Sequence, residues 1–141
     1  MFLLDTNVIS ELRRPDRTDP AVRHWASSWS IANFYLSTIT ILEVHLGALR
    51  LERRDKVQGV AIRSWVEQLL DQFDGRILPL DSGVALRTAE LHVPDPKSDH
   101  DAIIAATGLV HGMTVVTRNV RDFQDTSVEL LDPWTSATLG G

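Results

Sequence analysis

The sequence predicts an α/β domain with a parallel sheet of four or five strands and helices on both faces. Short apolar segments alternate with longer segments whose apolar residues recur at helical spacing, as in strand–helix–strand units. The short segments are apolar at nearly every position, which is typical of strands buried on both faces. The chain has 141 residues without repeats or linkers, so we expect one domain over residues 1–135 and a flexible tail at 136–141.

The first half of the chain predicts two strands, each followed by helix. The opening strand leads into a helix that stops at Pro15, because proline cannot donate to the helical hydrogen-bond ladder. A second helix begins at Pro20, since proline is favoured in the first helical turn, and it places Trp25 and Trp29 one turn apart on one face. The elements predicted here are a strand at 2–4, a helix at 6–14, a helix from 20, a strand at 34–37 and a helix at 38–51.

The second half predicts helices from their apolar patterns and strands from β-branched runs. The clearest helix carries a stripe from Ile62 to Phe73 and ends at Gly75. Within the preceding helix, Leu42, Leu46 and Leu49 fall along one side. The elements predicted after residue 60 are a helix at 62–73, a strand at 76–80, a helix at 81–92, a helix at 99–112 and strands at 113–117 and 127–131.

Composition narrows the class of protein. The chain contains no cysteine, which excludes disulfides and thiolate metal sites. It has no signal-peptide pattern and no apolar stretch near the ~20 residues that cross a bilayer, so we expect a soluble, cytoplasmic protein. The formal net charge is −5, whereas nucleic-acid binders are usually basic. That objection weakens if several acids surround bound cations, because the ions reverse the local field.

Four acids are candidates for such a site, and each also has an ordinary structural explanation. Asp5 ends the first strand and could cap the next helix, and Glu43 could be a boundary residue whose carboxylate reaches water. Asp101 completes the pattern Ser98-x-x-Asp101, which is a helix capping box. Asp122 lies in a predicted loop and could be a turn former.

The joint placement of these acids favours a site over four separate structural roles. Asp5 and the segment 117–123 both follow strands, and parallel α/β sheets bind ligands beyond the carboxyl ends of their strands. The helix around Asp101 is apolar nearly all round, and Glu43 borders the same interior. Converging carboxylates repel one another unless a cation lies among them, and purely oxygen ligands select Mg²⁺ or Mn²⁺.

A divalent ion held by carboxylates next to a phosphate implies phosphodiester hydrolysis. One ion lowers the pKa of a bound water that attacks phosphorus and a second stabilises the leaving oxygen, so no protein nucleophile is required. Thr6, Thr117 and Asn119 are candidates to orient the carboxylates or waters. Lys97 and Arg118 are candidates to contact the phosphate backbone, and either could equally be an ordinary surface charge.

The residues resemble a PIN domain, specifically the VapC/FitB-like toxins of bacterial toxin–antitoxin pairs. The resemblance covers essentially the whole chain in order, and the segment at 101–123 is its most specific part. It is carried by "LLDTNVISEL" at 3–12, the helix around Glu43, "DAIIAATGLVHGMTVVTRNVRDF" at 101–123 and "LLDPW" at 130–134.

This resemblance implies a three-layer α/β/α fold and a Mg²⁺- or Mn²⁺-dependent endoribonuclease that cuts RNA and thereby inhibits translation and growth. It also implies a homodimer and a cognate antitoxin that inhibits the toxin by placing a segment across its cleft. By position in the motifs, the family's four metal-binding, catalytic acids fall on Asp5, Glu43, Asp101 and Asp122, and its polar companions on Thr117 and Asn119.

The chain departs from the family pattern in three places. The arginine often found just after the second acid is missing, and the loop at 93–98 has no match. Asp99 and His100 stand where family members tend to be apolar, and we rank a helix cap first for Asp99. Trp25 and Trp29 are expected to pack in the core, with a dimer or antitoxin contact as the second interpretation.

Two functions of other classes compete with the nuclease. A non-catalytic PIN binding module is disfavoured because all four acids are present. A phospho-acceptor domain of the receiver type is disfavoured because its paired acids, central aspartate and late lysine are not found in place. A nuclease that cuts DNA stays open, since the metal chemistry is indifferent to the 2′-hydroxyl.

Overall fold

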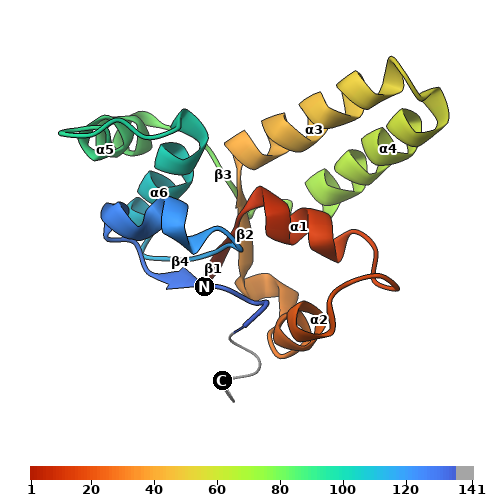
Figure 1. Cartoon of the computed structure of the whole chain (residues 1–141), viewed down its shortest axis with the longest axis horizontal. Helices are drawn as coiled ribbons and strands as arrows, with labels where there is room; N and C mark the ends of the chain where they lie inside the picture. Colours follow the sequence, from red (N-terminus) through yellow and green to blue (C-terminus); the bar gives the residue numbers. More distant parts are fainter. Residues whose placement is uncertain (136–141) are drawn as a thin grey trace.

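A computed structural model of the chain describes residues 1–135 and contains a five-stranded parallel sheet between layers of helices (Figure 1). The strand order is β3-β2-β1-β4-β5, so the first strand lies in the middle and the chain crosses to the other side after β3. The strands are β1 (Phe2–Leu4), β2 (Phe34–Ser37), β3 (Ile77–Leu78), β4 (Thr114–Val116) and β5 (Leu130–Leu131).

Six α-helices and two 3₁₀ helices connect the strands of the described chain. Helices α3 and α4 form a long hairpin that projects from the sheet, while α5 and α6 lie together on the other side of the molecule (Figure 1). The helices are α1 (Thr6–Leu12), α2 (Pro20–Ser27), η1 (Ile31–Asn33), α3 (Thr38–Glu52), α4 (Lys56–Gln72), α5 (Ser82–Leu91), α6 (Asp99–His111) and η2 (Val120–Thr126).

The pleat of β1 divides the core into two clusters. Phe2 and Leu4 join one cluster with residues of α1 to α4, whereas Leu3 joins another with residues of α6 and β4. Successive side chains of a strand point to opposite faces, so a continuously apolar strand requires helices on both faces. The three-layer α/β/α fold expected from the sequence is therefore confirmed.

Most elements agree with the sequence, and the differences concern helix starts and exposed faces. Helix α4 begins at Lys56, capped by Asp55, six residues before the apolar stripe starts. Leu42, Leu46 and Leu49 are exposed, because α3 buries the other side of the helix through Thr40, Val44 and Ala48. Within residues 1–135, no helix is both long and apolar enough to span a membrane.

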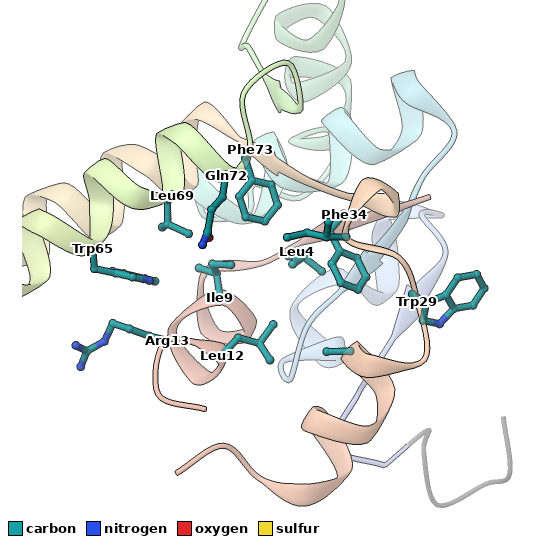
Figure 2. Close-up of a pocket in the computed structure, with 12 residues that line it drawn as sticks. Leu4, Ile9, Leu12, Arg13, Trp29, Phe34, Trp65, Leu69, Gln72 and Phe73 are labelled. Atoms are coloured by element: carbon teal, nitrogen blue, oxygen red, sulfur yellow. The ribbon is translucent and has the colours of Figure 1, made fainter. Parts of the chain in front are cut away.

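The two tryptophans have different environments. Trp25 is buried and packs edge-on against Phe2 and stacked against Phe34, as expected of a core residue. Trp29 lies beyond the end of α2 and is 46% exposed, with its ring edge-on to Phe2. It lines an apolar hollow of about 270 Å³ whose other walls come from β1, α1, α2, η1, β2 and α4 (Figure 2). Core packing is thus right for Trp25 and only partly right for Trp29.

Candidate active site

Asp5 is held rigidly where β1 meets α1. Its backbone amide donates to Val116 O at 2.9 Å, which continues the pairing of β1 with β4, and the residue is only 4% exposed. The amide of Thr6 donates to Oδ1 of Asp5 at 2.8 Å, and the hydroxyl of Thr117 donates to Oδ2 at 2.8 Å. Asp5 is therefore the N-cap of α1, as its structural explanation states, and at the same time presents a buried carboxylate at the sheet edge.

Thr117 links Asp5 to the loop that follows β4. Its fully buried hydroxyl accepts from the amide of Asn119 at 3.0 Å and from Nδ2 of Asn7 at 3.4 Å. Asn7 also accepts from the amide of Arg118 at 3.3 Å, so its side chain ties α1 to this loop. The sequence reasoning missed Asn7, although it directly follows Asp5-Thr6 in the opening motif. Thr6 contributes its amide, while its buried hydroxyl has no hydrogen-bond partner among the described residues.

His100 occupies the space between two of the acids. Its Nε2 lies 3.1 Å from Oδ1 of Asp5, and its Nδ1 forms an ion pair with Oε1 of Glu43. Burial alone would lower the pKa of His100, but the hydrogen bond to Asp5 and the charges of Asp5, Glu43 and Asp101 raise it above its ordinary value. The imidazole therefore lies between two carboxylates that favour its protonated form, a position that no sequence pattern indicated.

Asp101 and Asp122 complete the cluster. Asp101 lies in the first turn of α6, where its amide donates to the cap Ser98, as the capping box predicts. Burial raises the pKa of Asp101 above its ordinary value, Ser98 and His100 oppose that rise, and the charges of Asp122 and Asp5 add to it. Asp122 is exposed and lies in η2 instead of an open loop. Its charge contributes to the raised pKa of Asp101, so the two carboxylates lie within electrostatic range of each other.

Asp99 takes no part in the cluster and is not a cap. Ser98 caps α6, and the side chain of Asp99 is 89% exposed and pairs with Nε2 of His92 at 3.3 Å. The expectation of a capping role for Asp99 was wrong, because the preceding serine already fills that position.

The side chains of the two candidate phosphate contacts engage neighbouring loop residues. The guanidinium of Arg118 stacks over Trp134, with 4.9 Å between its central carbon and the ring centroid. Nζ of Lys97 lies 3.5 Å from the carbonyl of Asp95, and its amide donates to Nδ1 of His92. Their side chains thus brace the neighbouring loops in this structure, and whether they contact phosphate stays a prediction.

The donor chemistry of the cluster fits a divalent cation. The four acids offer only oxygen, and the imidazole of His100 already takes the position of a cation between two of them. Within residues 1–135, however, no three acidic or histidine side chains are arranged around one point as metal ligands. Because His100 separates Asp5 from Glu43, a shared ion requires its ring to turn away.

Residues 2–129 match the family model of the PIN domain. The chain belongs to the PIN domain family. It is 37% identical to toxin FitB of Neisseria gonorrhoeae over 140 residues, which cover 95% of this chain and 99% of that protein. It is 32% identical to VapC ribonuclease Y4jK of Sinorhizobium fredii, over 97% of this PIN chain and 100% of the relative.

Solved structures agree with this assignment. The crystal structure of FitAcB from Neisseria gonorrhoeae matches with a TM-score of 0.86 at 36% identity, covering 96% of this chain and 99% of that one. FitAB bound to a DNA fragment matches with a TM-score of 0.83 at 38% identity, covering 95% and 96%. DNA-bound VapBC from Salmonella typhimurium is 22% identical, with a TM-score of 0.76 over 94% of this chain and 97% of that one, and shows the shared fold. The resemblance found in the sequence is thereby confirmed.

Proposed function

We propose that this PIN domain is an endoribonuclease and the toxin of a bacterial toxin–antitoxin pair, cutting RNA phosphodiesters with a bound Mg²⁺ or Mn²⁺. The observation that carries the proposal is the contact of His100 with both Asp5 and Glu43 at the carboxyl edge of the sheet, where the charge of Asp101 also raises the pKa of His100. The relatives named toxin and ribonuclease, which align over nearly the full chain, support the same reaction.

The chain's own residues would hold and orient the reacting groups. Asp5 is the fixed element, because two hydrogen bonds hold its carboxylate and leave it little freedom. Asp101 and Asp122 present carboxylates from α6 and η2 to the same cluster. Glu43 is partly buried on α3 and can follow a ligand more freely than Asp5.

Asp5, Glu43, Asp101 and Asp122 would ligate the metal, with Thr117 and Asn119 supporting them. A bound Mg²⁺ or Mn²⁺ supplies an activated water and neutralises charge on the phosphate that is cut. Burial is the largest cause of the raised pKa of Asp101, and the charges of Asp122 and Asp5 add to it. That added repulsion between carboxylates supports a cation at this site.

The partners follow from the same assignment. We propose an RNA substrate, a cognate antitoxin, a homodimer and a cytoplasmic location. The solved FitAB and VapBC structures that share this fold support the antitoxin. A net charge of −5 suits a basic antitoxin segment electrostatically.

The test compares two neighbouring acids. Asp101→Asn should abolish cleavage of RNA in Mn²⁺, and EDTA should abolish cleavage by the unaltered protein. Asp99→Asn is the matched control, because Asp99 lies two residues from Asp101 and its side chain is exposed, so the change removes the same charge outside the cluster. This variant should cut RNA normally. Substantial cleavage by Asp101→Asn, or cleavage in EDTA, contradicts the proposal. A well-folded protein that neither cuts RNA nor binds Mn²⁺ in calorimetry would instead be a binding module.

A further inference from the structure

A second hollow, of about 370 Å³, adjoins the acids and is not explained by the fold. It lies between α1, α3 and α4, and we call it the arginine groove. Glu43 and Thr6 line it, so it opens onto the carboxylate cluster. Its lining residues are Thr6, Ser10, Arg13, Arg14, Glu43, Val44, Gly47, Ala48, Leu51, Arg54, Ile62 and Trp65.

The cations of this groove lack the acidic partners that surface arginines usually find. The ion pairs of Arg side chains within residues 1–135 involve Arg63 and Arg87, and neither lines the groove. Arg14 and Arg54 are exposed, and Arg13 lies over the ring of Trp65 at 5.7 Å (Figure 2). Burial lowers the pKa of Arg13, and the charge of Arg14 lowers it further, so the positive charges face one another without compensation.

The one acid of the groove is already engaged. The carboxylate of Glu43 pairs with His100 at the site end, which leaves a positive field along the remaining length. The floor is uncharged and open, because nothing lies within 4 Å of the position where a Cβ of Gly47 would be. An anionic chain can therefore lie close to α3.

We propose that the arginine groove binds the phosphates of single-stranded RNA on one side of the cleaved bond, with Arg14 and Arg54 as the contacts. This inference rests on the proposed nuclease function and adds the path of its substrate. Charge selects the occupant, because a basic protein segment would meet three arginines, whereas a polyphosphate chain neutralises them. The groove also shows how a protein of net charge −5 can bind RNA, by concentrating cations next to its site.

The experiment uses two double variants of the full chain. Arg14→Gln with Arg54→Gln removes the groove charges, and Arg50→Gln with Arg53→Gln removes two exposed charges that do not line it. Binding of a fluorescent single-stranded RNA is measured in EDTA, where no cleavage is expected, over a series of salt concentrations. Each lost phosphate contact reduces the magnitude of the slope of log K against log salt by about 0.7. The slope of the groove variant should therefore be smaller by about 1.4, and this variant should bind the RNA about ten-fold more weakly. In Mn²⁺ its KM should rise about ten-fold with kcat unchanged.

The outcomes separate this inference from the proposed function. If the unaltered chain cuts RNA while both double variants have equal KM and equal salt slopes, the groove proposal is wrong and the nuclease stands. If RNA binding in EDTA depends on the groove but nothing is cut in Mn²⁺, the nuclease is wrong, and the groove is an RNA-binding site without a cleaved bond beside it. Loss of binding to a poly-glutamate peptide, with RNA binding unchanged, would assign the groove to an acidic protein segment and overturn the proposal.

Discussion

The carboxylate cluster and the arginine groove share Glu43, but one carboxylate of the cluster is buried and hydrogen-bonded, whereas two arginines of the groove are exposed. In the cluster, Asp5 accepts two hydrogen bonds and faces His100, and its side chain is almost fully buried. In the groove, Arg14 and Arg54 are exposed and have no acidic partner among the described residues. Long side chains left in water keep their rotamer freedom and adapt to a ligand, whereas a buried carboxylate with fixed donors cannot.

This difference predicts two kinds of mutational effect. A group that must be placed within a fraction of an ångström, such as Asp5, should control kcat when it is changed. A group that only neutralises phosphate should control KM and its salt dependence. The proposed difference between cluster and groove is wrong if substituting a groove residue lowers kcat as much as substituting a residue of the cluster.

The largest effect is expected at the most constrained acid. Asp5→Asn should lower RNA cleavage by more than about 100-fold, since even groups that only support metal ligands cost 10- to 100-fold when removed. It should also reduce stability by about 1–3 kcal/mol, because an amide nitrogen would face either the Thr6 amide or the Thr117 hydroxyl, both of which donate.

Steady-state cleavage and urea unfolding of the metal-free protein measure the two effects of Asp5→Asn. Asp16→Asn provides the control, being an exposed acid on the loop after α1. If the Asp5→Asn protein has an unchanged kcat, Asp5 is not part of the active site, and the proposed difference between cluster and groove is wrong.

The residues of the cluster could be predicted from the sequence, whereas most contacts between them could not. Asp5 was placed at the sheet edge because its strand is short, apolar and followed by capping residues, and Asp101 because its helix is apolar and opens with a capping box. Those signals are local, and the structure agrees with them. The positions of the strands followed from the same reasoning, since a parallel strand buried on both faces has few alternatives.

Features that depend on distant segments could not be predicted. His100 meets Glu43 across 57 residues, and a single histidine in the first turn of an apolar helix has no periodicity that would indicate an ion pair. The arginine groove joins the end of α1 to the α3–α4 turn, and in sequence Arg14 and Arg54 are indistinguishable from ordinary surface charges. The stripe of Leu42, Leu46 and Leu49 is exposed, because α3 is apolar on more than one side and periodicity cannot say which side is covered.

The next effect in size concerns the cation within the cluster. His100→Gln should destabilise the metal-free protein by up to about 3 kcal/mol below pH 6.5, since Asp5 then lies buried without a charged partner. The folded-state pKa of His100 is raised, so the stability it contributes is fully present below the unfolded pKa of about 6.5 and is lost as pH rises through the folded pKa. The unaltered protein should therefore lose stability in that window, and His100→Gln should not.

Thermal unfolding in EDTA between pH 5 and 9 tests this prediction, with His111→Gln as the control on the exposed end of the same helix. Removing His100 should at the same time strengthen Mn²⁺ binding in calorimetry, because the ring no longer lies between Asp5 and Glu43. Weaker Mn²⁺ binding by His100→Gln would make the imidazole a ligand and not a displaced cation.

The smallest effect is expected at Gly47, on the floor of the groove, and it tests whether this position can accept a side chain without loss of stability. Gly47→Ala should stabilise the protein by about 0.5–1 kcal/mol, since alanine is the better helix former and the added methyl meets no atom within 4 Å. Gly83→Ala in α5 makes the same change in an exposed helix far from the groove and is the matched control. Both variants should unfold at higher urea concentration, and only Gly47→Ala can alter KM for RNA, because its methyl enters the proposed path of the phosphates. A destabilised Gly47→Ala protein would mean that the groove closes in solution, and the division between a fixed cluster and an open groove would then be wrong.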